Sequence, residues 1–351
     1  MVFLIIIFLA FLILVHELGH FSAAKIFGVK VEEFGFGFPP RLKAKKIGET
    51  LYSLNLLPLG GFVKIFGLEK EPTPEEKLKP LKNSFLAQPF WRRFLILSAG
   101  VLMNIFFAWL IFSFIFMMGS PFHLLIAEVN PNSPAQINHL KPGDIILKIS
   151  QNGQILEPPL TAENVSQFIK SKPDAVFDLT IKREGKVLNF QIQGRLNPPK
   201  GEGALGIVLA DIGSNKEPFF KAIFKATETT FSGLKEIVVG FFNFFSRIFV
   251  NAEVLKSLAG PVGIFSLALN FSQLGLFHLL QFIAWLSLNL AVLNFLPFPA
   301  LDGGQIIFLL IEKIKGSPVP FEVQRLINSL GLAALLILML LITLQDIGRI
   351  L

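Results

Sequence analysis

The chain has 351 residues, of which 52% are hydrophobic and 16% charged, and its mean hydropathy is +0.61. This composition excludes an ordinary soluble globular protein and predicts a protein of the lipid bilayer. The net charge of +7 does not indicate nucleic-acid binding, because the Lys and Arg residues are scattered through predicted loops without interleaved aromatic residues. Since the chain has no cysteine, disulfides and thiolate ligands are excluded, and a metal site must use His, Asp or Glu.

The first apolar run, residues 1–24, is long enough for one membrane crossing and contains His16-Glu17-Leu18-Gly19-His20. On a helix, His16 and His20 lie one turn apart on one face, where both can bind one metal ion, and Glu17 lies beside them. The H-E-x-x-H pattern is typical of zinc proteases, whose glutamate accepts a proton from water at the metal. The alternative, the wet end of an ordinary first crossing, is disfavoured because ionisable groups at membrane depth are costly. A cleaved signal peptide is also disfavoured, because no Lys or Arg precedes the run.

Residues 25–93 form a predicted loop that contains thirteen Lys and Arg residues. The positive-inside rule places this loop in the cytoplasm, and the N-terminus and residues 119–256 on the other side. Within the loop, residues 51–66 predict a membrane-associated β-hairpin of two short strands joined at Pro58-Leu59-Gly60-Gly61. Two roles stay open for it: a small satellite core, or an edge strand near the metal that pairs with an extended peptide.

The second crossing is predicted over residues 94–118, where Asn104 is expected to make an interhelical hydrogen bond. Residues 122–212 then have the composition of a soluble domain, with strands predicted over 144–149 and 175–181 and a helix over 162–171. His123 and His139 are expected on the surface of this domain. The following segment, residues 217–256, has a polar stripe beside many Phe residues, which predicts an amphipathic helix on the membrane surface.

The long apolar run 257–311 has room for more than one element, and the third crossing is predicted in the region 276–311. Asp302 is the only Asp, Glu, Lys or Arg in that run, so its carboxylate needs a cation at membrane depth. The prolines and glycines around it break the helix, which is tolerated where backbone is packed in protein or lines a wet cavity. A plain helix end is the alternative. Asp302 therefore becomes the candidate third metal ligand, and a fourth crossing is predicted over 326–345.

Two sets of motifs resemble known families. The HELGH sequence together with Asn294-Phe295-Leu296-Pro297-Phe298-Pro299-Ala300-Leu301-Asp302-Gly303-Gly304 is similar to the site-2 protease family of intramembrane zinc metalloproteases. Its bacterial regulator-of-sigma-E branch is the most similar, although the best-known members carry two PDZ domains and only one fits here. Ser133-Pro134-Ala135 with Leu140-Lys141-Pro142-Gly143-Asp144 resembles bacterial PDZ domains. A weaker match to the carboxylate-binding loop of a permuted PDZ domain covers Gly203, Leu205, Gly206 and Ile207.

The expected fold is thus a polytopic α-helical membrane protein with about four transmembrane helices, a membrane-associated β-hairpin and an inserted extracytoplasmic PDZ-like α+β domain. The resemblance implies one Zn²⁺ ion held by His16, His20 and Asp302, with Glu17 as the general base. It also implies a bacterial inner-membrane protease, with its active site toward the cytoplasm, that cleaves single-pass membrane proteins after an earlier cut. Examples are a membrane-anchored anti-sigma factor and a signal-peptide remnant.

By the same resemblance Asn294 contacts the substrate backbone, and the hairpin residues expected to bind substrate are Leu54, Asn55, Gly60, Gly61 and Phe62. The PDZ-like domain would exclude large ectodomains or bind a peptide C-terminus. An alternative is a non-catalytic, zinc-bound membrane PDZ receptor for peptide C-termini. A zinc transporter is disfavoured, because it would need polar residues along several helices, whereas here they gather at one site.

Overall fold

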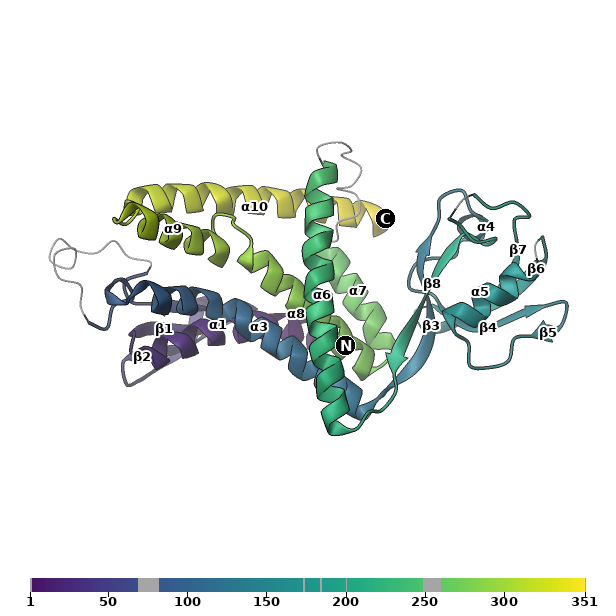
Figure 1. The fold of residues 1–351 in the computed structure, drawn as a ribbon, viewed down its shortest axis with the longest axis horizontal. Helices are drawn as coiled ribbons and strands as arrows, with labels where there is room; N and C mark the ends of the chain where they lie inside the picture. The colour runs from purple at the N-terminus through teal and green to yellow at the C-terminus, as the bar shows by residue number, and fades with distance from the viewer. Residues whose placement is uncertain are drawn as a thin grey trace. The chain divides into compact units, whose positions relative to one another are not determined.

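The computed structural model describes residues 2–68, 82–172, 174–183, 185–199, 201–248 and 260–350. Four helices in these ranges are long and apolar enough to cross a membrane, and each corresponds to one of the four predicted crossings (Figure 1). Their spans are Ile6–Ile26, Phe90–Met118, Leu276–Phe295 and Phe321–Gly348. The prediction of a polytopic helical membrane protein is therefore confirmed in its helices.

The chain divides into two compact units. Unit 1 comprises Met1–Phe114, Ile223–Leu269 and Leu280–Leu351, and unit 2 comprises Ile115–Ala222 and Asn270–Leu279. The helices whose residues lie wholly or mainly in unit 1 are α1 (Val2–Ile26), η1 (Phe85–Ala87), α3 (Phe90–Met118), α6 (Phe219–Ile248), α7 (Pro261–Gln273), α8 (Leu276–Phe295), α9 (Asp302–Lys315) and α10 (Phe321–Ile350).

The predicted third crossing region, 276–311, consists of two helices rather than one. Helix α8 ends at Phe295, and α9 begins at Asp302 after a non-helical connection. Added Cβ atoms at Gly303 and Gly304 would collide with the backbone of this connection, at Leu296 and Phe298 respectively. The two glycines therefore let the first turn of α9 pack directly against the chain that precedes it, which fixes the position of Asp302.

Two long strands, β1 (Val31–Ile47) and β2 (Thr50–Ile65), pair antiparallel beside α1. Their register shows that each strand bends, so that its first and second halves form two separate segments of the sheet. Residues 33–36 pair antiparallel with residues 61–64 on one side. On their other side they pair with residues 51–54, which run in the same direction as residues 33–36. Residues 51–55 pair in turn with 41–46. The sheet thus has four segments, in the order 61–65, 31–38, 51–57 and 41–47.

The predicted turn of the hairpin is wrong in position. The chain turns at Gly48 and Glu49, next to the Ile47–Thr50 pair, where Gly48 has a φ of 60°. Two-residue turns of this kind need positive φ, which glycine adopts without strain. Gly60 and Gly61 instead lie inside β2, where added Cβ atoms would come within 3.3 Å of Ile13 and 3.6 Å of Glu17. That glycine pair therefore allows close approach of β2 to α1.

Unit 2 contains a six-stranded sheet in which β7, β6, β4, β3 and β8 are neighbours in that order and β5 pairs with β4. The predicted strands over 144–149 and 175–181 and the predicted helix over 162–171 are confirmed as β4, β6 and α5. The core is aliphatic and aromatic, with Ile126, Phe177 and Ile192 fully buried. The elements of the unit are β3 (Ser120–Val129), α4 (Pro134–Ile137), β4 (Ile145–Gln151), β5 (Gln154–Ile155), α5 (Ala162–Lys170), β6 (Val176–Arg183), β7 (Lys186–Gln193) and β8 (Ile207–Ser214).

The two histidines expected on the surface of this domain differ. His139 is exposed, as predicted, whereas His123 is half-buried and its ring lies 5.1 Å from that of His278. Burial lowers the pKa of His123, and the nearby positive charge of Lys182 lowers it further. Sequence reasoning missed this pair because His278 belongs to a distant apolar run.

The predicted amphipathic helix is present as α6, and residues 249–256 of the predicted segment lie outside the described part of the chain. Its small residues face inward: Ala226 is fully buried, and Gly233 lies against the ring of Trp285 in α8. Trp109 of α3 donates a hydrogen bond from Nε1 to Thr227 at 3.0 Å. Large side chains on the other side of the helix are exposed, among them Phe220, Phe224, Phe231 and Phe242.

Candidate metal centre and active site

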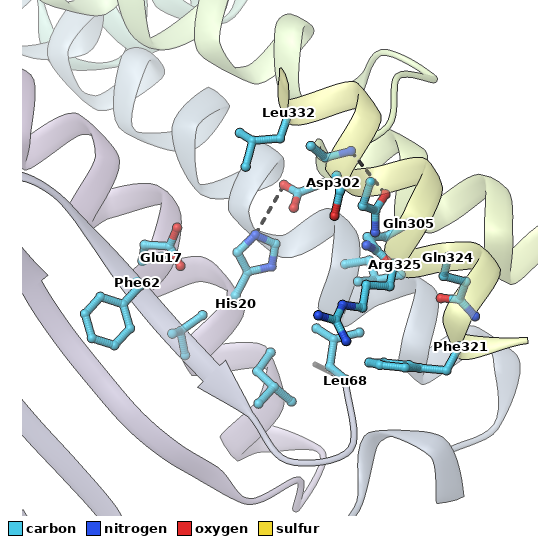
Figure 2. Close-up of a pocket in the computed structure, with 16 residues that line it drawn as sticks. Glu17, His20, Phe62, Leu68, Asp302, Gln305, Phe321, Gln324, Arg325 and Leu332 are labelled. Carbon is cyan, nitrogen blue, oxygen red and sulfur yellow. Dashed lines mark hydrogen bonds and ion pairs between the residues drawn. The ribbon is translucent and has the colours of Figure 1, made fainter. Parts of the chain in front are cut away.

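Three side chains meet where α1 and α9 approach each other. His16 and His20 project from one face of α1, and Asp302 is the first residue of α9. The Asp302 Oδ2 atom lies 3.0 Å from His16 Nε2 and 3.3 Å from His20 Nε2. Among the described residues these three form the one group of His, Asp or Glu side chains with the geometry of a metal site. Figure 2 shows the contact between His20 and Asp302, with Glu17 beside them.

The hydrogen bonds around the group fit a metal cation. His20 Nδ1 lies 2.8 Å from the carbonyl oxygen of Ile96, so Nδ1 carries the proton and Nε2 presents a lone pair. The His20 Nε2 atom is 3.2 Å from His16 Nε2, and it is also close to Asp302 Oδ2. Apart from the two imidazoles, Oδ2 finds no hydrogen-bond partner in the described ranges. Two imidazole nitrogens and a carboxylate are a common zinc donor set in catalytic sites.

Asn104 of α3 holds the other imidazole. Its Nδ2 lies 3.4 Å from His16 Nδ1, which confirms the predicted interhelical bond, and its fully buried Oδ1 has no partner in this orientation. A half-turn of the amide exchanges the two atoms, so that Oδ1 accepts the Nδ1–H of His16 and leaves His16 Nε2 free for the metal. Sequence reasoning gave Asn104 a structural role and missed its contact with a metal ligand.

Gly100 is a second residue that sequence reasoning missed. A Cβ atom there would collide with the ring of His20 and would lie 2.6 Å from His16 Cε1, so only glycine leaves room for the two imidazoles. Gly100 and Asn104 are four residues apart and therefore share one face of α3. That spacing of a glycine and an amide in an apolar run was the available signal.

Asn294, predicted beside the site, lies there. Its Nδ2 is 3.4 Å from His16 Nε2, on the metal-binding side of that ring. Asn294 comes from the last turn of α8, just before the non-helical connection that leads to Asp302. One short stretch of chain therefore brings both a candidate ligand and a neutral amide donor to the same face of His16.

A cavity of about 600 Å³ opens beside the ligands. Glu17, His20 and Asp302 line one part of it, and Phe62 and Val63 of β2 line another (Figure 2). The carboxylate of Glu17 accepts a hydrogen bond from the backbone of Val63. The general-base candidate is thus half-buried where the helix of the candidate ligands, the sheet and the cavity meet.

The opposite wall of the cavity is polar and comes from the start of α10. Gln324, Arg325, Asn328 and Ser329 line it, and Asn328 Oδ1 accepts a hydrogen bond from the backbone N–H of Ala300, two residues before Asp302. Sequence reasoning included Asn328 and Ser329 in the fourth crossing and assigned no role to Gln324 and Arg325. The signal was the pairing of polar residues four apart, which places them on one face of the helix.

The five hairpin residues predicted to bind substrate are not all at the cavity. Phe62 lines it, and Gly60 and Gly61 lie against α1. Leu54 and Asn55 do not line it, because they belong to the third segment of the sheet. The Asn55 amide instead donates to the carbonyl oxygens of Phe36 and Gly37 at 3.3 and 3.1 Å, where it secures the bend of β1.

In unit 2, the residues predicted to form a peptide loop precede and begin β8. Gly206 has a φ of 71° and donates its backbone N–H to the carbonyl oxygen of Gly203, while Leu205 is buried in the core. Ile207 starts β8, which pairs with β3 and is the last strand of the sheet among the described residues. The geometry is a tight turn that leads into an edge strand.

Comparisons with known proteins agree with the metal centre. The model of peptidase family M50 matches residues 4–338. A Clostridium perfringens protein named for zinc metalloprotease activity is 36% identical, with 98% of each chain covered. The regulator of sigma-W protease RasP of Bacillus subtilis is 26% identical over 98% of this chain and 97% of its own. An Arabidopsis thaliana chloroplast protein named as a membrane metalloprotease is 32% identical over 95% of this chain and 77% of its own. The chain therefore belongs to peptidase family M50, the site-2 protease family of zinc metalloproteases.

Proposed function

We propose that this metalloprotease hydrolyses peptide bonds within or at the edge of the bilayer, in the transmembrane segment of a single-pass membrane protein. The observation that carries the proposal is the convergence of His16, His20 and Asp302 among helices of membrane-crossing length. Ligands in such a position serve substrates that lie in the membrane. RasP is named for the regulation of a sigma factor, which supports an anti-sigma factor or a similar membrane-anchored protein as the substrate.

The chemistry divides between the metal and the chain. Zinc, when bound by the three ligands, polarises a carbonyl group and lowers the pKa of water toward about 7. Glu17 accepts the proton of the attacking water and passes it to the leaving amine. The Asn294 amide, 3.4 Å from His16 Nε2, is placed to donate to the backbone of the substrate. The hydrogen bonds that His20 and His16 donate to the Ile96 carbonyl oxygen and the Asn104 amide oxygen keep the imidazoles oriented throughout.

The sheet gives the substrate a place to unwind. A peptide carbonyl in a transmembrane helix is hydrogen-bonded and covered, so the helix must open before hydrolysis. Residues 61–64 pair with residues 33–36 on one side, and Phe62 and Val63 line the cavity on the other. An unwound substrate segment pairs with this edge as an added strand, which holds its carbonyl near the ligands. Gly60, Gly61 and Phe62 then contact the substrate.

The placement in the membrane follows from charge and composition. With residues 25–93 in the cytoplasm of a bacterium, the N-terminus and the sheet domain of unit 2 lie outside the inner membrane. Helix α6 lies along the membrane surface with its exposed Phe residues in the lipid interface. We assign the unit 2 domain as PDZ-like, with Gly203, Leu205, Gly206 and Ile207 as its peptide loop. It excludes bulky ectodomains or binds a newly made C-terminus, so that cleavage follows an earlier cut.

Replacement of Glu17 by Gln tests the proposal. The variant keeps the metal ligands but lacks the base, so cleavage of a model single-pass substrate in vesicles should fall at least about 100-fold. Zinc content of the purified protein should not change. Glu49→Gln, at the exposed turn between β1 and β2, is the matched control and should cleave normally.

Appreciable residual cleavage by the Glu17→Gln variant would remove Glu17 as the base. The alternative, a non-catalytic zinc-bound PDZ receptor, predicts that the wild-type protein does not cleave the substrate. Cleavage by the wild type that a metal chelator abolishes would exclude this alternative. It would also leave the cavity of about 600 Å³ beside Glu17 without a task.

A further inference from the structure

A second cavity, of about 360 Å³, lies on the face of the β1–β2 sheet that packs on α1. Its floor consists of two cross-strand rows, because Phe34 pairs with Tyr52 and Phe36 pairs with Leu54. Directly paired residues point to the same face of a sheet, so the four side chains form one apolar platform. This cavity shares no lining residue with the cavity at the metal ligands.

The two ends of the platform differ in chemistry. At one end it reaches Leu14, which lies in the middle of the span Ile6–Ile26 and therefore at membrane depth. At the other end the same cross-strand rows continue into the outermost segment of the sheet, where Lys45 pairs with Tyr52 and Lys43 pairs with Leu54. Both lysines are exposed and line the cavity. The groove thus runs from an apolar end in the membrane to a positively charged end outside it.

In the part of the chain that the structure describes, no carboxylate balances the charge of these lysines. Within the described ranges no carboxylate makes an ion pair with Lys43 or Lys45. The opposite face of the same sheet is different, because the buried Glu33 carboxylate there bonds Arg41 at 2.6 Å and Lys64 at 3.4 Å. On that face a carboxylate pairs with two of the cations, whereas the face with the apolar platform carries two lysines that pair with no described carboxylate.

We propose that this groove binds one anionic phospholipid, with an acyl chain on Phe34, Phe36, Tyr52 and Leu54 and the phosphate between Lys43 and Lys45. The order of chemistry along the groove is that of a lipid molecule. Its apolar end reaches membrane depth, where the acyl chain lies, and its charged end is at the edge strand, where the headgroup lies. The charge selects an anionic headgroup over a zwitterionic one, because each lysine near a membrane surface favours anionic lipid. The bound lipid anchors the outer edge of the sheet, and its binding is independent of the catalytic role of Glu17.

Native mass spectrometry of the purified full-length protein tests the site. The protein is titrated with phosphatidylglycerol or phosphatidylcholine of identical acyl chains. The wild type should bind one phosphatidylglycerol more tightly than phosphatidylcholine, and K43Q/K45Q should bind it about 20-fold more weakly. The matched control is K46Q, which removes a neighbouring exposed lysine from the opposite face of the same strand and should bind like the wild type.

Three results would overturn the proposal. Equal affinity of the wild type for the two lipids would mean that the lysines do not select the headgroup. An equal loss in K46Q and K43Q/K45Q would mean that general surface charge, rather than this groove, attracts the lipid. Displacement of the lipid by an equimolar amount of glycerol phosphate would mean that the site binds a phosphate group without its acyl chain. Because all of these variants keep Glu17, the result is separable from the outcome of the proteolysis test.

Discussion

Asp144 in unit 2 is buried and Asp302 in unit 1 is half-buried, and the two carboxylates are satisfied in opposite ways. Asp144 in unit 2 accepts two hydrogen bonds from Arg183 at 2.6 Å and one from the backbone N–H of Lys141. Asp302 in unit 1 directs Oδ2 at two imidazole nitrogens, and elsewhere in the described chain this atom meets no donor. A buried carboxylate needs positive charge or donors. The protein supplies them for Asp144, whereas the surroundings of Asp302 suit a metal ion.

Asparagine at these two positions should therefore separate a functional carboxylate from a structural one. Asp302→Asn removes a charged ligand, and the zinc content of the purified protein at limiting zinc should fall more than about tenfold. Asp144→Asn should leave zinc content unchanged. Elemental analysis of both variants measures this. Full zinc occupancy in Asp302→Asn would exclude Asp302 from the metal site.

A core substitution in unit 2 sharpens the comparison from the other side. Phe177 is fully buried in the apolar core of the sheet domain, so Phe177→Ala should destabilise that domain by about 3 to 5 kcal/mol. Hydrogen exchange should show faster opening of the amides of β4 and β6. Zinc content should stay at the wild-type value, because the metal ligands belong to unit 1. A parallel loss of zinc would show that the two units do not fold independently.

The smallest expected effect concerns the buried carboxylate of the β1–β2 sheet. Burial raises the pKa of Glu33, but the nearby Ser53 hydroxyl, the hydrogen bond from Lys64 and the charges of Lys64 and Arg41 outweigh it, so the pKa lies below its ordinary value. A group with a lowered pKa stabilises the fold above its ordinary value, about 4.3, and loses that contribution as the pH falls through the folded-state pKa.

Hydrogen exchange of β1 and β2 amides measures this contribution. The wild type should be about 1 kcal/mol more stable than Glu33→Gln at pH 6, and the two should converge below about pH 4. Glu49→Gln, at the exposed turn, should follow the wild type at every pH. A wild-type advantage that persisted at pH 3 would contradict the assignment.

The sequence was sufficient to predict the candidate metal site, because its polar residues stand out in apolar runs. Ionisable groups at membrane depth carry a high free-energy cost, so two histidines and one aspartate in apolar runs could be recognised as functional candidates. The candidate ligand set therefore followed from the sequence. The crossings followed from length and apolarity, and the strands of unit 2 followed from alternation.

Features that depend on close approach could not be predicted in this way. The Gly60-Gly61 pair was interpreted as a turn, although it allows the contact with α1. A glycine in a sequence is equally compatible with a turn and with close packing against a neighbouring element, so the two roles could not be distinguished. Gly100 and the polar start of α10 were missed for a related reason. Their roles depend on helices that are distant in the sequence, and no local pattern records which helix will be the neighbour.

The late position of Asp302 also affects the life of the protease before it is complete. The two histidines leave the ribosome first, whereas the third ligand follows roughly 280 residues later. At about 5 to 20 residues per second, a growing chain spends roughly 14 to 56 s in the membrane with two of its three ligands. During that interval the base and both imidazoles are present, but the catalytic metal site is not. The order of these residues along the chain therefore keeps the candidate metal site incomplete until most of the protein has been synthesised.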